Sequence, residues 1–471
     1  MCLGALAVSL SRNLQDWGIL GAIGKDIELG RERQVTGDMK SIRQVILASF
    51  IGTTIEWYDF FLYGTAAALV FNKLFFPNFD QLLGTLSAFS TFAVGFLARP
   101  FGGIIFGHFG DRVGRKSMLV YSLLIMGIAT FLVGLLPTYE TIGILAPAGL
   151  VLMRFAQGIG VGGEWGGAVL MAVEHSPKGA RGFAGSWPQM GVPAGLLLST
   201  SVFAAASSSL SEEQFLAWGW RIPFLLSVVL IGVGIFIRLR LLETPVFTRM
   251  VQNRSEAHRP LLDAFRDYSR NIVLAMGMRF AENGTFYIFT VFVLSYGTDE
   301  LKLPKNIMLG GVILSAVIGL FSIPAFGALS DRVGRRPVYL FGALFTLLFA
   351  FPFFWLINSK SAILVWLAIT LAVNVGHDAM YGPQAAYFSE LFGTRVRYTG
   401  ASLSYQLTSV FAGGFAPLIA TALMASVGYA AVAAYMSLMA LITLVSTYLA
   451  SETYRGEISE EEEVKSVVAQ M

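Results

Sequence analysis

The chain has 471 residues, of which 55% are hydrophobic and only 13% are charged, and its formal net charge is +3. Ordinary soluble domains carry about a quarter charged residues, so this composition predicts a membrane protein. The single cysteine, Cys2, excludes an intramolecular disulfide and leaves no thiolate cluster for a metal site. The basic residues are too few and too scattered among apolar runs to form a nucleic-acid-binding face.

Residues 1–38 are predicted to be a disordered or non-native N-terminal tail. The apolar stretch 1–10 is too short to span a membrane, and residues 11–38 show no helical period. Met39 is soon followed by Lys40 and Arg43, which is typical of the start of a membrane protein. We therefore expect the folded part of the chain to begin near Met39.

Twelve long apolar runs follow, and each is long enough to cross a bilayer as a helix, which takes about 20 residues. The predicted spans are 45–71, 82–106, 118–136, 142–173, 183–207, 222–239, 272–296, 307–329, 338–357, 362–388, 398–426 and 429–450. Most Lys and Arg residues lie at the termini and in the loops that follow even-numbered spans. Because cytoplasmic loops are enriched in Lys and Arg, both termini are predicted to be cytoplasmic in a multi-pass protein of a prokaryotic inner membrane.

The loops on this predicted cytoplasmic side repeat in the two halves of the chain. The loop after span 2 contains Gly107, Asp111, Arg112, Gly114 and Arg115, and the loop after span 8 contains Gly327, Asp331, Arg332, Gly334 and Arg335 at the same spacing. A second pair of loops repeats Glu174 and Arg181 as Glu390 and Arg397. Matched loops at nearly one offset predict two six-helix halves.

These motifs resemble the loop signature of the major facilitator superfamily, Gly-x-x-x-Asp-Arg-x-Gly-Arg-Arg/Lys. The stretches around Glu56 and Asp59 and around Arg154, Gln157 and Glu164 resemble its metabolite:proton symporter family. The resemblance covers about residues 41–452. It implies an all-α fold of two pseudo-symmetric six-helix bundles around a cavity that opens alternately to each side, and proton-coupled uptake of small organic acids or zwitterions.

The domains expected from this repeat are contiguous. They are the tail 1–38, an N-terminal six-helix half 39–240, a central cytoplasmic linker 241–270, a C-terminal six-helix half 271–451 and a cytoplasmic tail 452–471. Asp and Arg side chains of the repeated loops are suited to hold the cytoplasmic side closed through helix ends. The alternative is that these charges only set the topology.

Charged residues inside the predicted spans are costly, by about 2.5–3.5 kcal/mol each on insertion scales, so they should face a cavity or a partner. Asp59 lies deep in span 1, on one helical face with Glu56 and Tyr63, and is our first candidate for a proton site. Glu56 could instead form an interhelical bond. Glu164 lies in a glycine-rich stretch that is more typical of close helix packing.

The remaining intramembrane candidates would bind the substrate or a proton. Arg154, near Gln157, and Arg279 lie in different halves and could clamp a substrate carboxylate. Arg279 and Glu282 are spaced for an intrahelical pair, which is the alternative for both. In span 10, Asn374, Asp378 and Tyr381 share a face beside His377, which is more often a hydrogen-bonded core residue than a proton relay. For Arg99, three roles are equally compatible with the sequence: part of a gate, an anchor at a helix end, or a substrate ligand.

The sequence therefore predicts a secondary active transporter and not an enzyme, because no nucleotide loop, metal-ligand cluster or nucleophile triad is present. The expected partners are a small-molecule substrate and the lipid bilayer, with no nucleic acid and no obligate protein partner. No cofactor is expected, and the proton is the expected coupling ion. The alternatives are an uncoupled facilitator or exchanger of the same substrates, or a transporter-like sensor.

Overall fold

The computed structural model divides the chain into two units, Met1–Ala48 and Ser49–Met471, and it describes residues of the second only. The described residues are 50–113, 115–162, 169–170, 172–173, 176, 179–240, 266–393 and 396–455. Side chains are described throughout these ranges except at 104, 107–113, 115–119, 236–240 and 398. The predicted tail 1–38 and most of the predicted linker lie outside the described residues.

The described part of the N-terminal half is helical. It begins with a helix over residues 50–66 and continues with η1 (Ala67–Phe71), α3 (Asn72–Phe75), α4 (Gln81–Val113), α5 (Arg115–Leu135), α6 (Tyr139–Ile142), α7 (Leu145–Val161), α9 (Arg181–Gln189), α10 (Gly191–Ser209), α11 (Glu212–Gln214), η2 (Phe215–Gly219), α12 (Arg221–Leu225) and α13 (Ser227–Arg240). The η elements are π-helical turns, which widen the helix locally and are frequent at functional sites.

The C-terminal half repeats this organisation. Its helices are α16 (Ser269–Tyr287), η3 (Ile288–Phe292), α17 (Val293–Ser295), η4 (Tyr296–Glu300), α18 (Lys305–Val333), α19 (Arg335–Asn358), α20 (Ala362–Leu371), η5 (Ala372–His377), α21 (Asp378–Glu390), α22 (Arg397–Thr408), η6 (Ser409–Gly414), α23 (Ala416–Ser426) and α24 (Tyr429–Leu449). Helical residues occupy part of every predicted span, and the described residues contain no strand. Helices satisfy their backbone hydrogen bonds internally, as a hydrocarbon environment requires.

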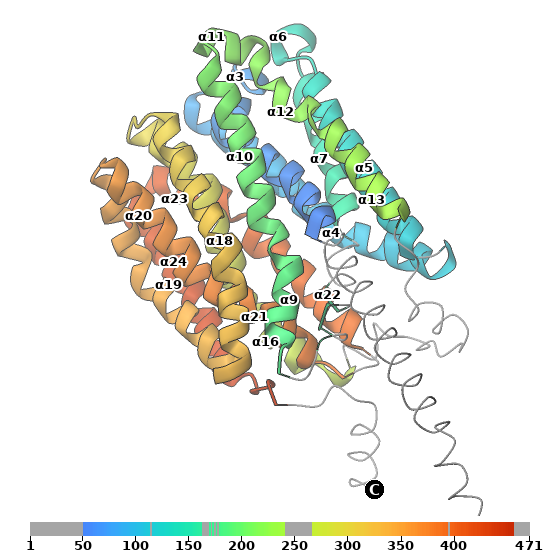
Figure 1. Ribbon diagram of the computed structural model, residues 1–471. Helices are drawn as coiled ribbons and strands as arrows, with labels where there is room; N and C mark the ends of the chain where they lie inside the picture. The colour runs from blue at the N-terminus through green and yellow to red at the C-terminus, as the bar shows by residue number, and fades with distance from the viewer. Residues whose placement is uncertain are drawn as a thin grey trace, which may run out of the picture. The chain divides into compact units, whose positions relative to one another are not determined.

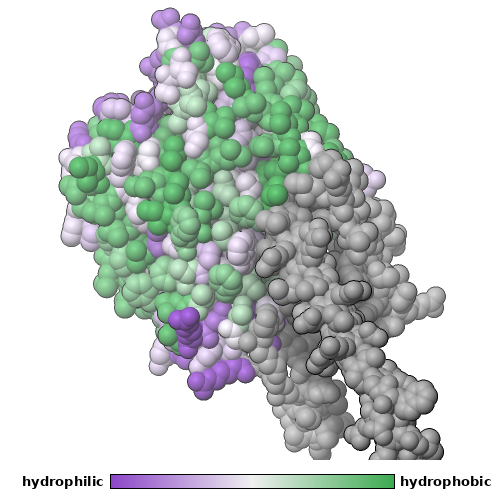
Figure 2. Space-filling view, viewed as in Figure 1, coloured by the Kyte–Doolittle hydropathy of each residue, from purple (hydrophilic) through white to green (hydrophobic). Residues whose placement is uncertain are grey.

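Apolar side chains cover the middle of the bundle. Eight helices in the described residues are long and apolar enough to cross a membrane, and two shorter apolar helices, Val120–Leu135 and Leu145–Val161, accompany them. Figure 2 shows hydrophobic side chains over the middle of the visible face and hydrophilic ones towards its two ends. Large apolar side chains such as Phe321 and Leu348 are about 70% exposed, as expected for a surface that faces lipid chains.

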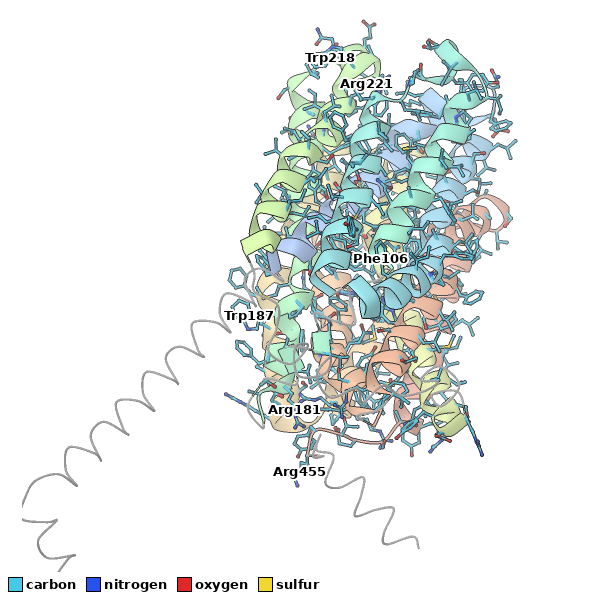
Figure 3. The ribbon with its side chains drawn as sticks, turned by 90° about the vertical axis from the view of Figure 1, so that its right-hand side faces the viewer. Phe106, Arg181, Trp187, Trp218, Arg221 and Arg455 are labelled. Atoms are coloured by element: carbon cyan, nitrogen blue, oxygen red, sulfur yellow. The ribbon has the colours of Figure 1, made fainter. Side chains whose placement is uncertain are left out.

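Charged and aromatic residues mark the two ends of the bundle. Arg181 and Arg455 lie near one end, which we call the basic end, and Trp218 and Arg221 lie near the other, which we call the opposite end (Figure 3). The basic end contains the loop between α18 and α19, where Gly334 adopts a φ of 106° that favours glycine. This end is the one predicted to be cytoplasmic.

Among the described residues, three sets of helices join the halves, and Figure 1 shows the first of them, α9 and α10 beside α18. α9 and α10 lie against α18, and α9 also lies against α21. On the other flank, α4 packs on η6 and α23. η1 contacts α17, which brings span 1 against span 7. The residues between these contacts enclose the candidate site.

Candidate substrate and proton sites

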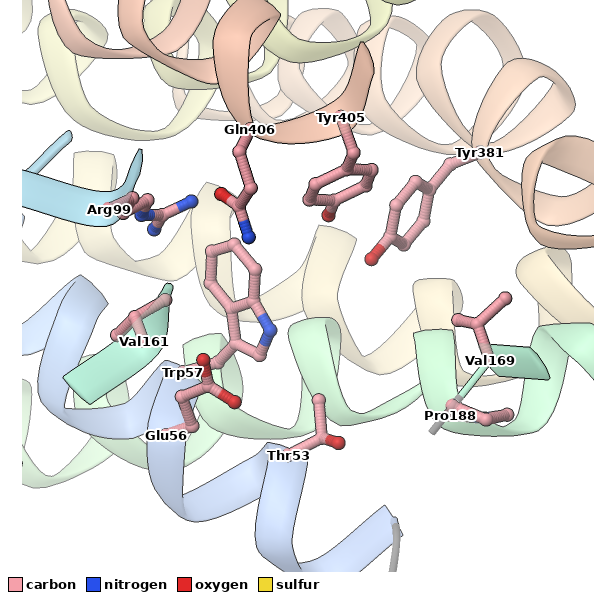
Figure 4. Close-up of a pocket in the computed structure, with 10 residues that line it drawn as sticks. All are labelled: Thr53, Glu56, Trp57, Arg99, Val161, Val169, Pro188, Tyr381, Tyr405 and Gln406. Atoms are coloured by element: carbon pink, nitrogen blue, oxygen red, sulfur yellow. The ribbon is translucent and has the colours of Figure 1, made fainter. Parts of the chain in front are cut away.

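A central cavity lies between the two halves. Its lining residues are Thr53, Glu56, Trp57, Arg99, Val161, Val169 and Pro188 from the N-terminal half and Tyr381, Tyr405 and Gln406 from the C-terminal half. Figure 4 shows Trp57 and Glu56 extending from the helix over residues 50–66 towards Tyr405 and Gln406 of α22. A second cavity beside it is lined by Trp57, Val192, Arg279, Glu282, Asn283, Phe286, Tyr287, His377, Tyr381 and Tyr405.

Both cavities are small in this structure. The space open to water is about 20 Å³ in the first cavity and about 10 Å³ in the second, and one water molecule needs roughly 10–15 Å³. A metabolite therefore does not fit until the halves separate. The structure represents a closed state of the central site.

Arg99 is the cationic side chain of the first cavity. It is 1% exposed and extends from α4 (Figure 4). The carbon centre of its guanidinium lies 4.4 Å from the ring centroid of Phe96 and 4.5 Å from that of Phe60. Its Nε and one terminal nitrogen have no hydrogen-bond partner in the described residues. Arg99 is thus a residue of the cavity lining that retains two nitrogens without a hydrogen-bond partner among the described residues, and Glu56 lines the same cavity.

Arg154 lies in a different environment within the N-terminal half. Its guanidinium donates to Gln157 Oε1 at 3.0 Å, and Gln157 donates to Thr130 Oγ1 at 2.7 Å. The rings of Phe60 and Tyr63 lie 4.2 and 4.3 Å from its carbon centre. Arg154 does not line either cavity. The structure thus places the predicted Arg154 and Gln157 together, outside the lining of both cavities.

Asp59 belongs to the same buried group as Arg154. It is 1% exposed, and neither of its carboxylate oxygens has a hydrogen bond of standard geometry. Arg154 interacts with it electrostatically, and the side chain of Thr130 is a polar neighbour. Tyr63 donates to Thr91 Oγ1 at 2.7 Å. Of the predicted face Glu56–Asp59–Tyr63, Glu56 borders the cavity, whereas Asp59 and Tyr63 surround Arg154.

Arg279 and Glu282 form an ion pair at 3.0 Å in α16, and both are buried. Gln384 of α21 bonds to both partners, accepting from Arg279 at 2.8 Å and donating to Glu282 at 2.9 Å. The ring of Tyr405 lies 3.2 Å from the guanidinium carbon of Arg279. Arg279 and Glu282 line the second cavity. The intrahelical pair that the sequence offered as the alternative for Arg279 and Glu282 is therefore present, with a third partner from span 10.

His377 and Asp378 extend this group. Asp378 Oδ1 lies 2.8 Å from His377 Nδ1, and Glu282 Oε1 lies 3.4 Å from His377 Nε2. Asn374 and Ser322 donate hydrogen bonds to Asp378 Oδ2. Sequence spacing grouped Asn374, Asp378 and Tyr381, but the link to Glu282 depends on tertiary packing between α16 and η5. His377 was predicted to be a hydrogen-bonded core residue, and the signal that could have placed it in the site is that no other histidine lies inside a predicted span.

At the basic end, the loop motif of the C-terminal half bonds to the N-terminal half. Both oxygens of Asp331 accept bonds at 2.8 Å from the backbone N–H groups of Gly182 and Phe183, at the start of α9. Arg335 pairs with Asp331 at 2.7 Å and with Glu390 at 3.2 Å. Arg181 approaches Glu390 at 3.9 Å. A helix N-terminus of one half is thus held by a carboxylate of the other.

The other predicted loop residues are placed as follows. Gly327 lies in α18 against α9, Arg332 is exposed, and Arg397 donates to the carbonyl oxygen of Ser389 at 3.0 Å. Glu164, Gly114 and Glu174 lie outside the described residues, as do the side chains of Asp111, Arg112 and Arg115; Gly107 lies within α4.

At the opposite end, Glu212 bridges the halves. Its carboxylate lies 3.3 Å from Lys73 Nζ and 3.4 Å from Lys305 Nζ. Asp299 of η4 also faces the N-terminal half, where it interacts with Lys73 and Gln81. Burial raises the pKa of Asp299 above its ordinary value, and Lys73 and Lys302 oppose that shift. Contacts between the halves therefore exist at both ends of the bundle.

Comparison with known proteins identifies the class. A sequence model of the Major Facilitator Superfamily matches residues 49–417. The chain is 43% identical over 431 residues to the shikimate transporter of Escherichia coli strain K12, covering 90% of this chain and 98% of that protein. It is 36% identical over 429 residues to the proline/betaine transporter of the same strain, covering 88% and 85%. These matches show relatedness over nearly the full length of each protein.

Solved structures agree with this assignment at the level of the fold. The proton:xylose symporter XylE superposes with a TM-score of 0.69 at 18% identity, covering 90% of this chain and 99% of XylE. The chain belongs to the major facilitator superfamily. It is a membrane-spanning transporter and not an enzyme, which confirms the family and the fold expected from the repeated loops.

Proposed function

We propose that this protein takes up a small carboxylated or zwitterionic metabolite together with protons, by alternating opening of the central cavity. The observation that carries this proposal is Arg99, a buried guanidinium with unused donors at a cavity walled by aromatic rings. Arginine binds carboxylates through two parallel N–H bonds, which gives strength and orientation. Shikimate and betaine, named for two relatives, both carry a carboxylate.

The substrate clamp in this proposal joins Arg99 of the N-terminal half to Arg279 of the C-terminal half. Arg99 replaces the Arg154 of the sequence-based hypothesis, since Arg154 does not line either cavity. Trp57 and Tyr405 border both cavities and supply apolar faces between the two cations. An anion bound here would draw the halves together, which couples binding to closure.

Proton coupling is assigned to Asp59. Asp59 is buried, neither of its carboxylate oxygens has a hydrogen bond of standard geometry, and it belongs to the same buried group as Arg154. A nearby cation changes the affinity of a carboxyl group for a proton. Movement of Arg154 relative to Asp59 would therefore change the affinity of Asp59 for a proton. With the basic end towards the cytoplasm, as the distribution of Lys and Arg predicts, this arrangement drives uptake.

Transport in proteoliposomes tests both parts of the proposal. Radiolabelled shikimate, glycine betaine and proline are offered to the purified chain, with an inside-alkaline pH gradient, without a gradient, and with a protonophore. We expect accumulation of a carboxylated compound only with the gradient, and its loss in Asp59→Asn. Asp267→Asn, which changes an exposed aspartate near the start of α16, is the control.

Equal uptake with and without the gradient would identify an uncoupled facilitator or exchanger. Gradient-driven accumulation by Asp59→Asn at the level of the unmodified protein would remove Asp59 from the proton pathway. Failure to transport any of the three carboxylated compounds would contradict the substrate class.

A further inference from the structure

His377 lies between two carboxylates inside the C-terminal half. Its Nδ1 lies 2.8 Å from Asp378 Oδ1 and its Nε2 lies 3.4 Å from Glu282 Oε1. The three side chains are each 1–2% exposed. The imidazole also stacks on Tyr381, with centroids 5.0 Å apart, and faces Phe286 at 4.4 Å. These contacts fix the ring so that both nitrogens face oxygen atoms.

Both ring nitrogens can donate a hydrogen bond to a carboxylate only if the imidazole carries one more proton than its neutral form. A neutral imidazole has one N–H donor and one acceptor lone pair, and an ionised carboxylate only accepts. A neutral ring would therefore direct its lone pair at one of the two carboxylates. One added proton turns both contacts into donor–acceptor bonds, and imidazole is the most basic of the three groups.

The charges around the group favour the same state. Arg279 is the cation that forms an ion pair with this group among the described residues, and it binds Glu282. With a neutral ring, Arg279 and two carboxylates leave an uncompensated negative charge, which is costly in a buried site. The other titratable or charged groups near the cluster are Arg99 of α4, Tyr287 of α16, Tyr339 of α19, Tyr381 of α21 and Tyr405 of α22.

The group also reaches the space where substrate is proposed to bind. His377, Glu282 and Arg279 line the second cavity, whereas Asp378 is held from within the half by Asn374 and Ser322. A substrate carboxylate at Arg279 would compete with Glu282 for that cation. Glu282 would then bind a neighbouring proton more strongly, so substrate binding would favour retention of the proton, which is the sign required for symport.

We propose that Glu282, His377 and Asp378 form a second proton-binding site, in which His377 carries the proton as an imidazolium in the closed state. This site is distinct from Asp59, which lies in the other half beside Arg154. Its link to substrate rests on the proposed function, whereas the protonation of His377 does not. The protein accordingly has one proton site in each half.

Nitrogen-15 NMR of histidine tests this assignment directly. The full chain, with its four histidines labelled, is studied in lipid from pH 5 to pH 9. The His377 signals are identified by their loss in His377→Gln. If that variant does not insert, His108→Gln, His175→Gln and His258→Gln are combined, which leaves His377 as the single histidine.

We expect two protonated ring nitrogens for His377 at pH 7. Asp378→Asn should lower the titration midpoint of the ring by about one to three pH units, since it removes an opposite charge at hydrogen-bond distance. Asp267→Asn should leave the midpoint unchanged. One protonated and one bare nitrogen at pH 7 would overturn the proposal, whatever the transport assay shows. Conversely, absence of gradient-driven uptake with an imidazolium at His377 would overturn the proposed function alone.

Discussion

Arg99, Arg154 and Arg279 are all buried, and their hydrogen bonds decide what each can bind. Arg154 donates to Gln157, and Arg279 donates to Glu282, Gln384 and Ser409. Arg99 instead lies among the rings of Trp57, Phe60 and Phe96. Aromatic rings stabilise a guanidinium through their faces and leave its N–H edge available to a ligand. Arg99 is therefore best suited to receive a substrate carboxylate.

Substitution of Arg99 separates this role from a general structural one. A charge-assisted bond contributes about 1.5–3 kcal/mol, so Arg99→Gln should weaken the apparent affinity for the transported carboxylate roughly 10-fold or more. Arg99→Lys should restore only part of the loss, because an ammonium cannot bind in a bidentate manner. The measurement is the concentration dependence of initial uptake by proteoliposomes.

Arg221→Gln is the matched control for this experiment. Arg221 donates to the carbonyl oxygens of Gly134 and Leu136 at the opposite end and does not line either cavity. We expect its apparent affinity to equal that of the unmodified protein. Equal affinities for Arg99→Gln and Arg221→Gln would show that Arg99 does not bind the substrate.

The helices themselves were predictable, but the directions of their polar side chains were not. Run length and the repeated loops identified helical segments and the family, because burial of a helix in lipid demands a continuous apolar stretch. Arg154 lies on a face of α7 that does not line either cavity. That orientation is set by the rotation of α7 against α4 and α5, which the sequence does not specify. Glu282 and His377 are far apart in the chain, so their contact could not be predicted from the spacing of residues within one helix.

α9 and α18 approach so closely that glycine is required at their contact. A Cβ atom at Gly327 would lie 2.6 Å from the carbonyl oxygen of Gly182, and a Cβ at Gly182 would overlap the carbonyl oxygen of Gly327. Backbone cannot move aside as a flexible side chain can. Gly182→Ala should therefore push the two helices apart and favour opening of the basic end.

Labelling of a cavity residue measures that opening. With Cys2 replaced, Thr53→Cys places the single thiol at the cavity, and its alkylation rate by a maleimide is followed from the basic end. We expect Gly182→Ala to raise the rate several-fold. Gly232→Ala, at a helix position with open space around it, should not change the rate. A rate unaffected by Gly182→Ala would mean that the helices adjust without opening.

At the scale of the whole molecule, the opposite end should respond to pH through Asp299. Its pKa is raised by burial above the ordinary value of 3.8, and the group interacts with Lys73 and Gln81 of the N-terminal half. Opening exposes the group and returns its pKa towards that ordinary value, so the closed state binds the proton more tightly. Protonation therefore favours closure: the effect is complete below the ordinary pKa and disappears as the pH rises through the raised one.

Distances between spin labels at Glu213→Cys and Ser361→Cys report this equilibrium, since both residues are exposed at the opposite end and belong to different halves. We expect the short-distance population to grow on acidification and this growth to be reduced in Asp299→Asn. Growth of the long-distance population on acidification would contradict the assigned sign.

The contacts that close the two ends differ in strength. At the opposite end, Glu212 is 64% exposed, and its ion pair with Lys305, the one of its two pairs that joins the halves, should contribute only about 0.2–1 kcal/mol. At the basic end, Asp331 is 6% exposed and binds Arg335 together with two backbone N–H groups of α9. Bonds to a charged group contribute about 1.5–3 kcal/mol each. Closure of the basic end should therefore depend far more on a single residue.

Asp331→Asn keeps one acceptor oxygen but loses the charge that both Arg335 and the helix N-terminus require. We expect it to shift the population about tenfold towards the form open at the basic end, which a second label pair at that end would record as longer distances. Glu212→Gln should lengthen the distance between Glu213→Cys and Ser361→Cys by a change in population of only about twofold to fivefold. If Glu212→Gln produced the larger change, closure would be governed by the opposite end, and the loop motif of the C-terminal half would serve topology alone.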